Sequence, residues 1–329
     1  MQTHIPPTLS EWKIGSRFGK KSTAREVLRG VNLEKRLAVI TGAASGIGKA
    51  TARALAEAGA AVVIAGRNPE ALDRARAEIS SVSAQQRVHA FHLDLMSIAS
   101  IDRFADEVSA LDRPLDVLIN NAAVTGPLVR NELGIESQLM TNFIGHAVLS
   151  SRLAQALVRA GRSRVVCLSS FGHHYSPVVF EDLNFEHRPY SAWDGYGQSK
   201  TACVLLAVKL SQTLGEHGVD AFAVHPGAIM TELGRSMSQE DFEFARQRGS
   251  IPSPDDWKTL DGGAATSVWA ATEPLLAGRA PLYLEDCGIA PVLDQPNYHC
   301  GVMKYALDAD NAERLWSATE SLIQRALPL

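Results

Sequence analysis

Cysteine is scarce in this sequence, and its few residues are widely separated. Cys167, Cys203, Cys287 and Cys300 form no Cys-x-x-Cys pair. Isolated thiols in a chain of 329 residues predict a reduced, intracellular protein rather than a disulfide-stapled one. His299 stands beside Cys300, but two adjacent residues without a second ligand pair argue against a zinc site. We therefore predict no bound metal.

Long hydrophobic runs and blocks of like charge are also missing. No apolar stretch approaches the ~20 residues that a membrane-spanning helix needs, and the first residues show no apolar core of a secretory signal. The net charge of −4 and the scattered arginines favour neither nucleic acid nor an anionic membrane surface. We expect a cytoplasmic protein whose partner is a small molecule.

Linkers, repeats and low-complexity segments are absent as well. The length alone would allow about two domains, but nothing in the composition divides the chain. We predict an N-terminal arm over residues 1–35, with a short helix near 23–28, and a single domain over 36–329. The arm can pack on this domain or on a neighbouring subunit.

What the sequence does contain is a regular alternation of apolar runs with helix patterns of about a dozen residues or more. Such alternation predicts an α/β fold of the Rossmann type, a doubly wound parallel sheet with ligands at the carboxyl ends of its strands. We expect strands at 37–40, 61–65, 88–93, 116–119, 164–168, 219–224 and 281–284. We expect helices at 49–58, 69–80, 97–110, 133–160, 196–214, 262–272 and, at the C-terminal end, 308–326.

The first expected strand runs into a glycine-rich turn that spans Thr41 to Gly48 and contains Gly42, Gly46 and Gly48. A strand, a glycine turn and a helix N-terminus together offer backbone N–H groups to a phosphate. The spacing is G-x-x-x-G-x-G rather than G-x-G-x-x-G, yet both leave out Cβ atoms where the backbone approaches a pyrophosphate. A loop that merely needs flexible residues is the alternative, and the strand and alanine-rich helix around it favour phosphate binding.

The second expected strand ends in Gly66-Arg67 rather than in a carboxylate. An acidic residue at this point usually binds a ribose 2′-hydroxyl, whereas an arginine suits a 2′-phosphate. Lys49 can add positive charge, although Arg67 can also begin an ordinary solvated turn before Pro69. We favour NADP(H) over NAD(H).

Polar residues follow several of the other expected strands. Asp94 can accept from an adenine amine or cap the helix that starts near Ser97, and the two roles are compatible. Asn120-Asn121 and Ser169-Ser170 follow two more strands and reach the same edge of the sheet. Within the helix at 133–160, Asn142 lowers helix propensity, which invites a functional explanation, although a satisfied core amide is the alternative.

Tyr196 and Lys200 lie four residues apart in a helix-forming run and therefore share one helical face. A phenol titrates near pH ~10 in water, and a cation a few ångströms away favours the phenolate. Such a phenol can exchange a proton with an alcohol or carbonyl oxygen. The pattern alone is common in half-exposed helices, so its place among the other motifs is what favours chemistry.

Two further segments have compositions that suit the walls of a pocket. The interval 171–195 is rich in aromatic residues, which either pack on the domain or surround an apolar ligand. Its His173, His174 and His187 show no metal-binding pattern, so we interpret them as loop or wall residues. Residues 228–260 predict a lid. In the C-terminal helix we expect the packing residues Leu315, Trp316 and Leu322.

Taken together, these motifs resemble the short-chain dehydrogenase/reductase family, from about residue 30 to residue 325. One departure is Ala123, where the family usually has glycine. The lengthened interval between Ser170 and Tyr196, and the motif Tyr196-Gly-Gln-Ser-Lys200, resemble the retinol dehydrogenase and WW-domain oxidoreductase branch. The motifs that support the resemblance are Thr41-Gly42-x-x-x-Gly46-Ile47-Gly48, Asn120-Asn121-Ala122-Ala123, Asn142, Ser170, Tyr196-x-x-x-Lys200 and Pro226-Gly227.

The resemblance implies a role for each of four catalytic residues. Tyr196 would be the general acid/base, and Lys200 would favour its phenolate and bind the nicotinamide ribose. Ser170, rather than Ser169, would hold the substrate oxygen, and Asn142 would fix a water in a proton path. In many relatives the two long helices pair between subunits, which implies a homo-oligomer.

The resemblance also implies a set of cofactor-binding residues. Asp94 and Leu95 would face adenine, and Asn121 and Ala122 would face the adjoining ribose. Pro226, Gly227 and Thr231 would line the nicotinamide pocket. The full set is Gly42, Ala44, Ser45, Gly46, Ile47, Gly48, Arg67, Asp94, Leu95, Asn121, Ala122, Tyr196, Lys200, Pro226, Gly227 and Thr231.

These expectations predict an NADP(H)-dependent oxidoreductase that acts on an alcohol or carbonyl of a small, apolar substrate. One alternative is a regulatory protein that senses NADP(H), which would have no use for the four catalytic positions. Another is an epimerase or dehydratase that retains its cofactor.

Overall fold

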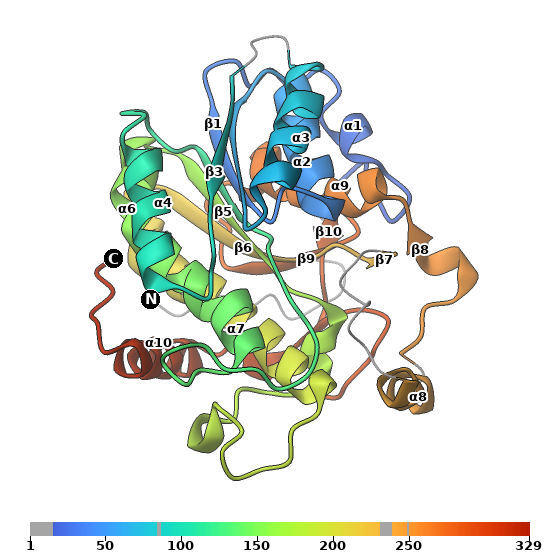
Figure 1. The fold of residues 1–329 in the computed structure, drawn as a ribbon. Coiled ribbons are helices and arrows are strands. Elements are labelled where there is room, and N and C mark those ends of the chain that lie inside the picture. Colours follow the sequence, from blue (N-terminus) through green and yellow to red (C-terminus); the bar gives the residue numbers. More distant parts are fainter. Residues whose placement is uncertain (1–15, 84–86, 231–238, 249) are drawn as a thin grey trace.

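The structure is a computed structural model that describes residues 16–83, 87–230, 239–248 and 250–329. In these residues eight strands form one central sheet, in the order β10-β9-β6-β5-β4-β1-β2-β3 (Figure 1). All neighbours are parallel except β10, which pairs antiparallel with β9 at one edge. The strands are β1 (Leu37–Thr41), β2 (Ala61–Gly66), β3 (Val88–His92), β4 (Val117–Asn120), β5 (Ser163–Leu168), β6 (Val219–His225), β9 (Leu282–Glu285) and β10 (Gly288–Ile289).

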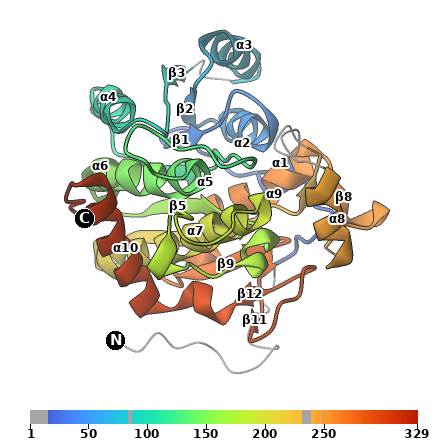
Figure 2. The same ribbon diagram turned by 60° about the horizontal axis from the view of Figure 1, so that its bottom comes forward.

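Helices cover both faces of this sheet, which confirms the predicted doubly wound fold (Figures 1 and 2). One face packs a buried cluster around Ile40, Ile64 and Trp269, and the other packs Phe104 and Phe143. The first face is covered by α1 (Ala24–Val27), α2 (Gly46–Glu57), α3 (Pro69–Ser80) and α9 (Leu260–Thr272). The second is covered by α4 (Ile98–Ser109), α5 (Ser137–Leu139), α6 (Gly145–Arg159) and α7 (Ala192–Leu214).

The described part of the N-terminal arm packs on its own domain. Thr23 and Glu26 form a capping box that starts α1, because each side chain binds the backbone N–H of the other residue. Val27 and Leu28 are buried in the same cluster as α9, and Lys20 forms an ion pair with Asp256. Of the two alternatives for this arm, these contacts support packing on the domain.

The helix predicted to start at residue 133 starts later, and that prediction was wrong by one turn. Gly134 has a φ of +75°, a left-handed conformation that a right-handed helix excludes. The buried carboxylate of Glu136 then accepts from the N–H groups of Gln138 (2.8 Å) and Leu139 (2.7 Å), so the helix begins at Ser137. A π-helical segment, Met140–Ile144, separates α5 from α6.

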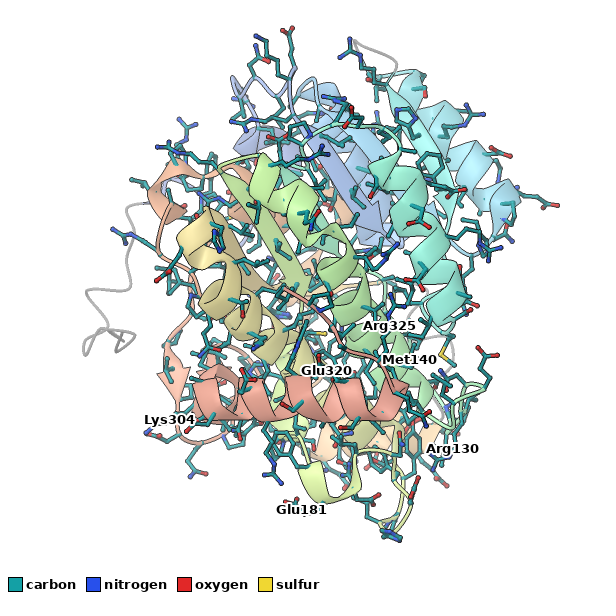
Figure 3. The ribbon with its side chains drawn as sticks, turned by 90° about the vertical axis from the view of Figure 1, so that its left-hand side faces the viewer. Arg130, Met140, Glu181, Lys304, Glu320 and Arg325 are labelled. Atoms are coloured by element: carbon teal, nitrogen blue, oxygen red, sulfur yellow. The ribbon has the colours of Figure 1, made fainter. Side chains whose placement is uncertain are left out.

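The C-terminal helix α10 (Ala309–Ile323) lies across the face that α7 presents, as Figure 3 shows beside the labels Glu320 and Arg325. Leu315 and Trp316 are buried as predicted, and Leu322 is partly buried. Lys209 of α7 pairs with Glu313 at 2.6 Å. The helix therefore completes the second layer.

The predicted lid contains short elements within its described part. Strand β7 (Ala228–Ile229) pairs in parallel with β8 (Trp257–Lys258), and α8 (Gln239–Gln247) lies between them in the sequence. A lid function stays a prediction. No helix in the described ranges is both long and apolar enough to cross a membrane.

Candidate active site

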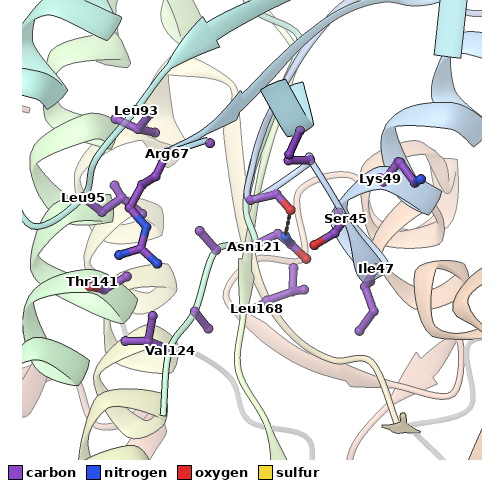
Figure 4. A pocket seen from close by; sticks show the side chains of 18 of the residues that line it. Ser45, Ile47, Lys49, Arg67, Leu93, Leu95, Asn121, Val124, Thr141 and Leu168 are labelled. Atoms are coloured by element: carbon purple, nitrogen blue, oxygen red, sulfur yellow. Dashed lines mark hydrogen bonds between the residues drawn. The ribbon is translucent and has the colours of Figure 1, made fainter. Parts of the chain in front are cut away.

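A pocket of about 760 Å³ opens at the carboxyl edge of the parallel strands (Figure 4). Residues that follow six strands line it, which is where a doubly wound sheet binds its ligands. Its lining includes Gly42, Ala44, Ser45, Gly46, Ile47 and Gly48 after β1, Arg67 after β2, Asp94 and Leu95 after β3, Asn121 and Ala122 after β4, Ser169 after β5, Pro226 after β6, and Tyr196 and Lys200 of α7.

The glycines of the first turn are required by close approach of the backbone. A Cβ on Gly48 would lie 2.4 Å from the carbonyl oxygen of Gly42, far inside van der Waals contact. Gly42 itself has a φ of +65°, and a Cβ there would lie 2.8 Å from Cα of Ala122. The turn therefore keeps its tight shape only with glycine at both positions.

The N-terminus of α2 points into the pocket with its amide groups free of a side-chain cap. Ser45 is the N-cap residue, yet its side chain accepts no hydrogen bond from the first turn. Gly46, Ile47 and Gly48 of that turn line the pocket. Uncapped N–H groups at the start of a helix of 12 residues suit an anionic group such as a pyrophosphate.

Arg67 lines the same pocket from the end of β2, and in Figure 4 its side chain extends into it. The side chain is exposed and forms no ion pair or hydrogen bond within the described part of the chain. Lys49, in contrast, donates to Glu78 at 2.8 Å. Of these two cations, Lys49 has an ion-pair partner and Arg67 has none among the described residues.

Asp94 lines the pocket as well, and the alternative that it caps the next helix was wrong. Ser97 is the N-cap of α4, with its hydroxyl oxygen accepting from Ser100 N–H. Asp94 instead accepts from the N–H of Met96 at 3.0 Å, closing a local turn. Leu95 follows it in the pocket wall.

Asn121 fastens the turn after β4 to the glycine turn. Its side-chain amide donates to the carbonyl oxygen of Thr41 at 2.7 Å. The Thr41 hydroxyl oxygen accepts in return from the N–H groups of Asn121 (2.9 Å) and Ala122 (3.0 Å). Because the two turns are bonded to each other, Ala122 and Gly42 form one continuous wall.

Tyr196 and Lys200 meet in this pocket, on the face of α7 that the four-residue spacing predicted. Both side chains are almost fully buried, with 7% and 3% of their surface exposed. The Lys200 ammonium lies 5.5 Å from the centre of the Tyr196 ring and donates to the carbonyl oxygen of Leu168 at 2.9 Å. A phenol and an ammonium are thus held together beside the cofactor-sized cavity.

The two serines after β5 have different surroundings. The buried Ser169 donates its hydroxyl to the carbonyl oxygen of Lys200 at 2.8 Å, which ties β5 to α7. The half-buried Ser170 accepts from the N–H of Gly172 at 3.1 Å, so its own hydroxyl proton remains available. Gly172 also separates Ser170 from Tyr196: a Cβ on it would lie 2.7 Å from the tyrosine ring. Ser169, and not Ser170, lines the pocket.

Asn142 lies in the π-helical segment, behind the pocket rather than in its wall. Its amide binds Val124 twice, accepting from the N–H at 2.8 Å and donating to the carbonyl at 3.0 Å. It also donates to the hydroxyl of Ser199 at 2.9 Å. Its side chain therefore positions the turn after β4 against α7, and its part in a proton path stays a prediction.

Gly227 and Thr231 are the remaining predicted cofactor residues. Gly227 has a φ of +101° and packs on the side chain of Lys258, next to the pocket but outside its lining. Thr231 lies outside the described residues.

Comparison of the sequence with known protein families identifies the family of this chain. The model of the family described as short chain dehydrogenase matches residues 36–241. The chain belongs to the short-chain dehydrogenase/reductase family.

The relatives include a probable oxidoreductase of Streptomyces lividans, 41% identical over 87% of this chain and 97% of its own length. Short-chain dehydrogenase TIC 32 B, chloroplastic, of Brassica napus is 35% identical over 94% and 95% of the two chains. Retinol dehydrogenase 13 of Mus musculus is 34% identical over 88% and 84%.

Among solved structures, an uncharacterized protein from Mycobacterium Paratuberculosis superposes with a TM-score of 0.70. It is 31% identical, and the match covers 94% of this chain and all of that one. The dehydrogenase/reductase chemistry of the family, with a nicotinamide dinucleotide as cofactor, thus applies to the chain.

The residues that line the pocket suit a nicotinamide dinucleotide. The uncapped start of α2 and the glycine turn suit the pyrophosphate, and the small Ala122 leaves room beside them. Arg67, after β2, supplies a guanidinium without an ion-pair partner in the described chain, and Tyr196 and Lys200 line the pocket from α7. A cavity of about 760 Å³ is within the range of cofactor sites.

The rings of His173 and His174, which follow Ser170, bind backbone groups. His173 is wholly buried; one ring nitrogen accepts from Met303 N–H at 3.1 Å, and the other donates to the Ser170 carbonyl at 2.6 Å. Among the described residues no cluster of three or more histidine, cysteine or acidic side chains could hold a metal ion. Burial holds the pKa of His173 well below its usual value.

Sequence reasoning missed a buried hydrogen bond between Thr41 and His146. The Thr41 hydroxyl lies 2.9 Å from Nε2 of His146, whose Nδ1 lies 2.9 Å from the carbonyl oxygen of Asn142. Since that carbonyl can only accept, Nδ1 donates and Nε2 accepts from Thr41. No local motif signals this bond, because the residues meet only through the sheet and α6.

Proposed function

We propose that this chain is an NADP(H)-dependent oxidoreductase that transfers a hydride between nicotinamide and an alcohol or carbonyl carbon of a small, apolar substrate. The observation that supports it is the meeting of Tyr196 and Lys200 in the pocket that also contains the glycine turn and Arg67. When bound, the nicotinamide supplies or accepts the hydride.

In this proposal the protein supplies proton transfer and orientation. During reduction the Tyr196 hydroxyl donates its proton to the carbonyl oxygen of the substrate, and during oxidation its phenolate accepts the proton of the alcohol. The positive charge of Lys200 stabilises that phenolate. The available hydroxyl of Ser170 donates to the substrate oxygen and orients it.

The test of the reaction is the substitution Tyr196→Phe, which keeps the ring and removes the proton donor. Turnover should fall by roughly 10²–10⁴-fold, the usual contribution of a positioned acid/base. Binding of NADPH, followed by its fluorescence, should stay close to that of the unmodified chain.

The matched control is Tyr298→Phe, which removes a hydroxyl from a tyrosine that does not line the pocket. A panel of ketones, aldehydes and alcohols with NADPH and NADP would supply the substrate for both assays. Normal rates in Tyr196→Phe would remove the proposed acid/base.

The preference for NADP(H) is supported by the guanidinium of Arg67, which has no ion-pair partner among the described residues. The substitution Arg67→Asp should lower kcat/KM for NADPH by about 10-fold or more, because charge-assisted hydrogen bonds contribute ~1.5–3 kcal/mol. The same change should favour NADH, whose free 2′-hydroxyl can donate to a carboxylate. An unchanged ratio of the two kcat/KM values would show that Arg67 does not read the phosphate.

An apolar substrate is supported by aromatic rings next to Tyr196. The ring of Trp193 lies 6.2 Å from that of Tyr196 and 4.9 Å from that of Tyr175. Phe171 lies 6.2 Å from Tyr175. These rings place apolar surface beside the proposed proton donor.

Two other functions remain as alternatives with simple tests. A regulatory protein that senses NADP(H) would bind the cofactor but convert no member of the substrate panel. An epimerase or dehydratase with retained cofactor would turn over substrate without a net change in the absorbance of added NADPH. A cytoplasmic location is part of our proposal, and the relative named chloroplastic shows why it needs its own test by fractionation.

A further inference from the structure

The wall of the pocket that follows Arg67 is formed by one face of α3. Ala71, Arg74 and Glu78 line the pocket at the three- and four-residue spacing of one helical face. Leu72 and Ile79, on the adjoining face of the helix, are buried in the cluster beside the sheet. The packing of α3 thus fixes which of its charged side chains can meet a ligand.

The charges on this wall are only partly neutralised. Glu78 accepts from Lys49 at 2.8 Å, so these two charges cancel. Arg74, like Arg67, is exposed and forms no ion pair or hydrogen bond with another described residue. The hydrogen bond from Lys49 lowers the pKa of Glu78, and the charge of Arg74 also helps to lower it. Arg67 and Arg74 thus both line the pocket without a hydrogen-bonded partner in the described chain.

A phosphate monoester is the anion that such a pair suits. It bears about −1.5 to −2 charges near neutral pH and has three strong acceptor oxygens. One guanidinium can bind two of these oxygens, and a second can bind the remainder. A ribose hydroxyl, in contrast, has no charge to match two cations.

We propose that Arg74 is a second phosphate-binding residue, which takes the 2′-phosphate of the cofactor together with Arg67, and that Glu78 weakens this subsite by neutralising Lys49. The inference rests on the proposed preference for NADP(H). It adds that Arg67 and Arg74 both contribute to the preference for NADP(H), and that the carboxylate of Glu78 reduces this preference.

The test measures binding and not turnover. The full chain and its variants are titrated calorimetrically with 2′,5′-ADP, which has the 2′-phosphate, and with 5′-AMP, which lacks it. Arg74→Ala should weaken 2′,5′-ADP by about 10-fold and leave 5′-AMP within about two-fold, since only the charge-assisted bonds to the 2′-phosphate are lost.

Glu78→Gln provides a test of the opposite sign. It removes a negative charge from the wall and releases Lys49, so 2′,5′-ADP should bind several-fold more tightly while 5′-AMP changes little. The matched control is Arg76→Ala on the same helix, because Arg76 pairs with Asp73 at 3.7 Å and does not line the pocket. Neither ligand should respond to that control.

The outcomes separate this inference from the proposed function. If the unmodified chain binds the two nucleotides equally, the preference for NADP(H) itself is wrong. If Arg67→Ala lowers the selectivity and Arg74→Ala does not, the preference stands and the role of Arg74 is refuted. Equal losses for both nucleotides in Arg74→Ala, or weaker 2′,5′-ADP binding in Glu78→Gln, would also refute it.

Discussion

At the scale of single residues, one buried histidine beside the site has hydrogen bonds that require its neutral form. His146 is 1% exposed, donates from Nδ1 to the Asn142 carbonyl and accepts at Nε2 from Thr41. Burial lowers its pKa to about 4. The neutral ring therefore connects the start of the glycine turn to the helix segment of Asn142.

This histidine should make the stability of the protein depend on pH. Its pKa is near ~6.5 in an unfolded chain and about 4 in the folded one, so the unfolded chain binds more protons between these values. The free energy of unfolding should then fall as the pH drops from 6.5 to 4. At pH 5 the loss from this residue alone should be about 2 kcal/mol.

The measurement compares the unmodified chain with His146→Gln by chemical denaturation at pH 6.5 and pH 5. Other buried histidines are present in both proteins and cancel in the comparison. The variant should lose about 2 kcal/mol less than the unmodified chain over this range. Equal losses in the two proteins would contradict the assignment.

At the scale of elements, the C-terminal helix α10 supports α7, which contains Tyr196 and Lys200. Trp316 of α10 is 5% exposed, and the ammonium of Lys209 lies 5.8 Å from its ring centre. Neither Trp316 nor Lys209 lines the pocket, so α10 contacts α7 on the side away from it. The helix should therefore contribute to stability and not to cofactor binding.

The substitution Trp316→Ala should lower the free energy of unfolding by about 3 kcal/mol or more, as large aromatic truncations in a core do. The Kd for NADPH should stay unchanged. Leu322→Ala on the same helix is the control, and its smaller, partly buried side chain should cost less. An equal loss for both variants would show that Trp316 has no special place in this core.

At the scale of the whole molecule, most of the sheet was predictable because its central strands are buried on both faces and therefore appear as continuous apolar runs. The glycine turn, Arg67 and the Tyr196–Lys200 pair were predictable because each depends on local spacing. The start of α5 was not, since it depends on the left-handed Gly134 and on the buried Glu136. Arg74 and Glu78 were missed because only the packing of α3 turns them toward the pocket.

The expected homo-oligomer stays a prediction at this scale. In the described residues α10 crosses part of the outer face of α7, one of the two long helices from which pairing between subunits was expected (Figure 3). Pairing through that face would therefore also bring α10 to the interface.

The four thiols, all within the described part of the chain, differ in how far water reaches them. Cys167, Cys203 and Cys287 are enclosed by the core, whereas Cys300 is half-buried beside Gly301. A maleimide dye in solution can therefore attach at a single native position without engineered cysteines. That position adjoins Tyr298, whose ring stacks on Tyr175, so the fold itself provides an attachment point for a spectroscopic reporter near the aromatic cluster.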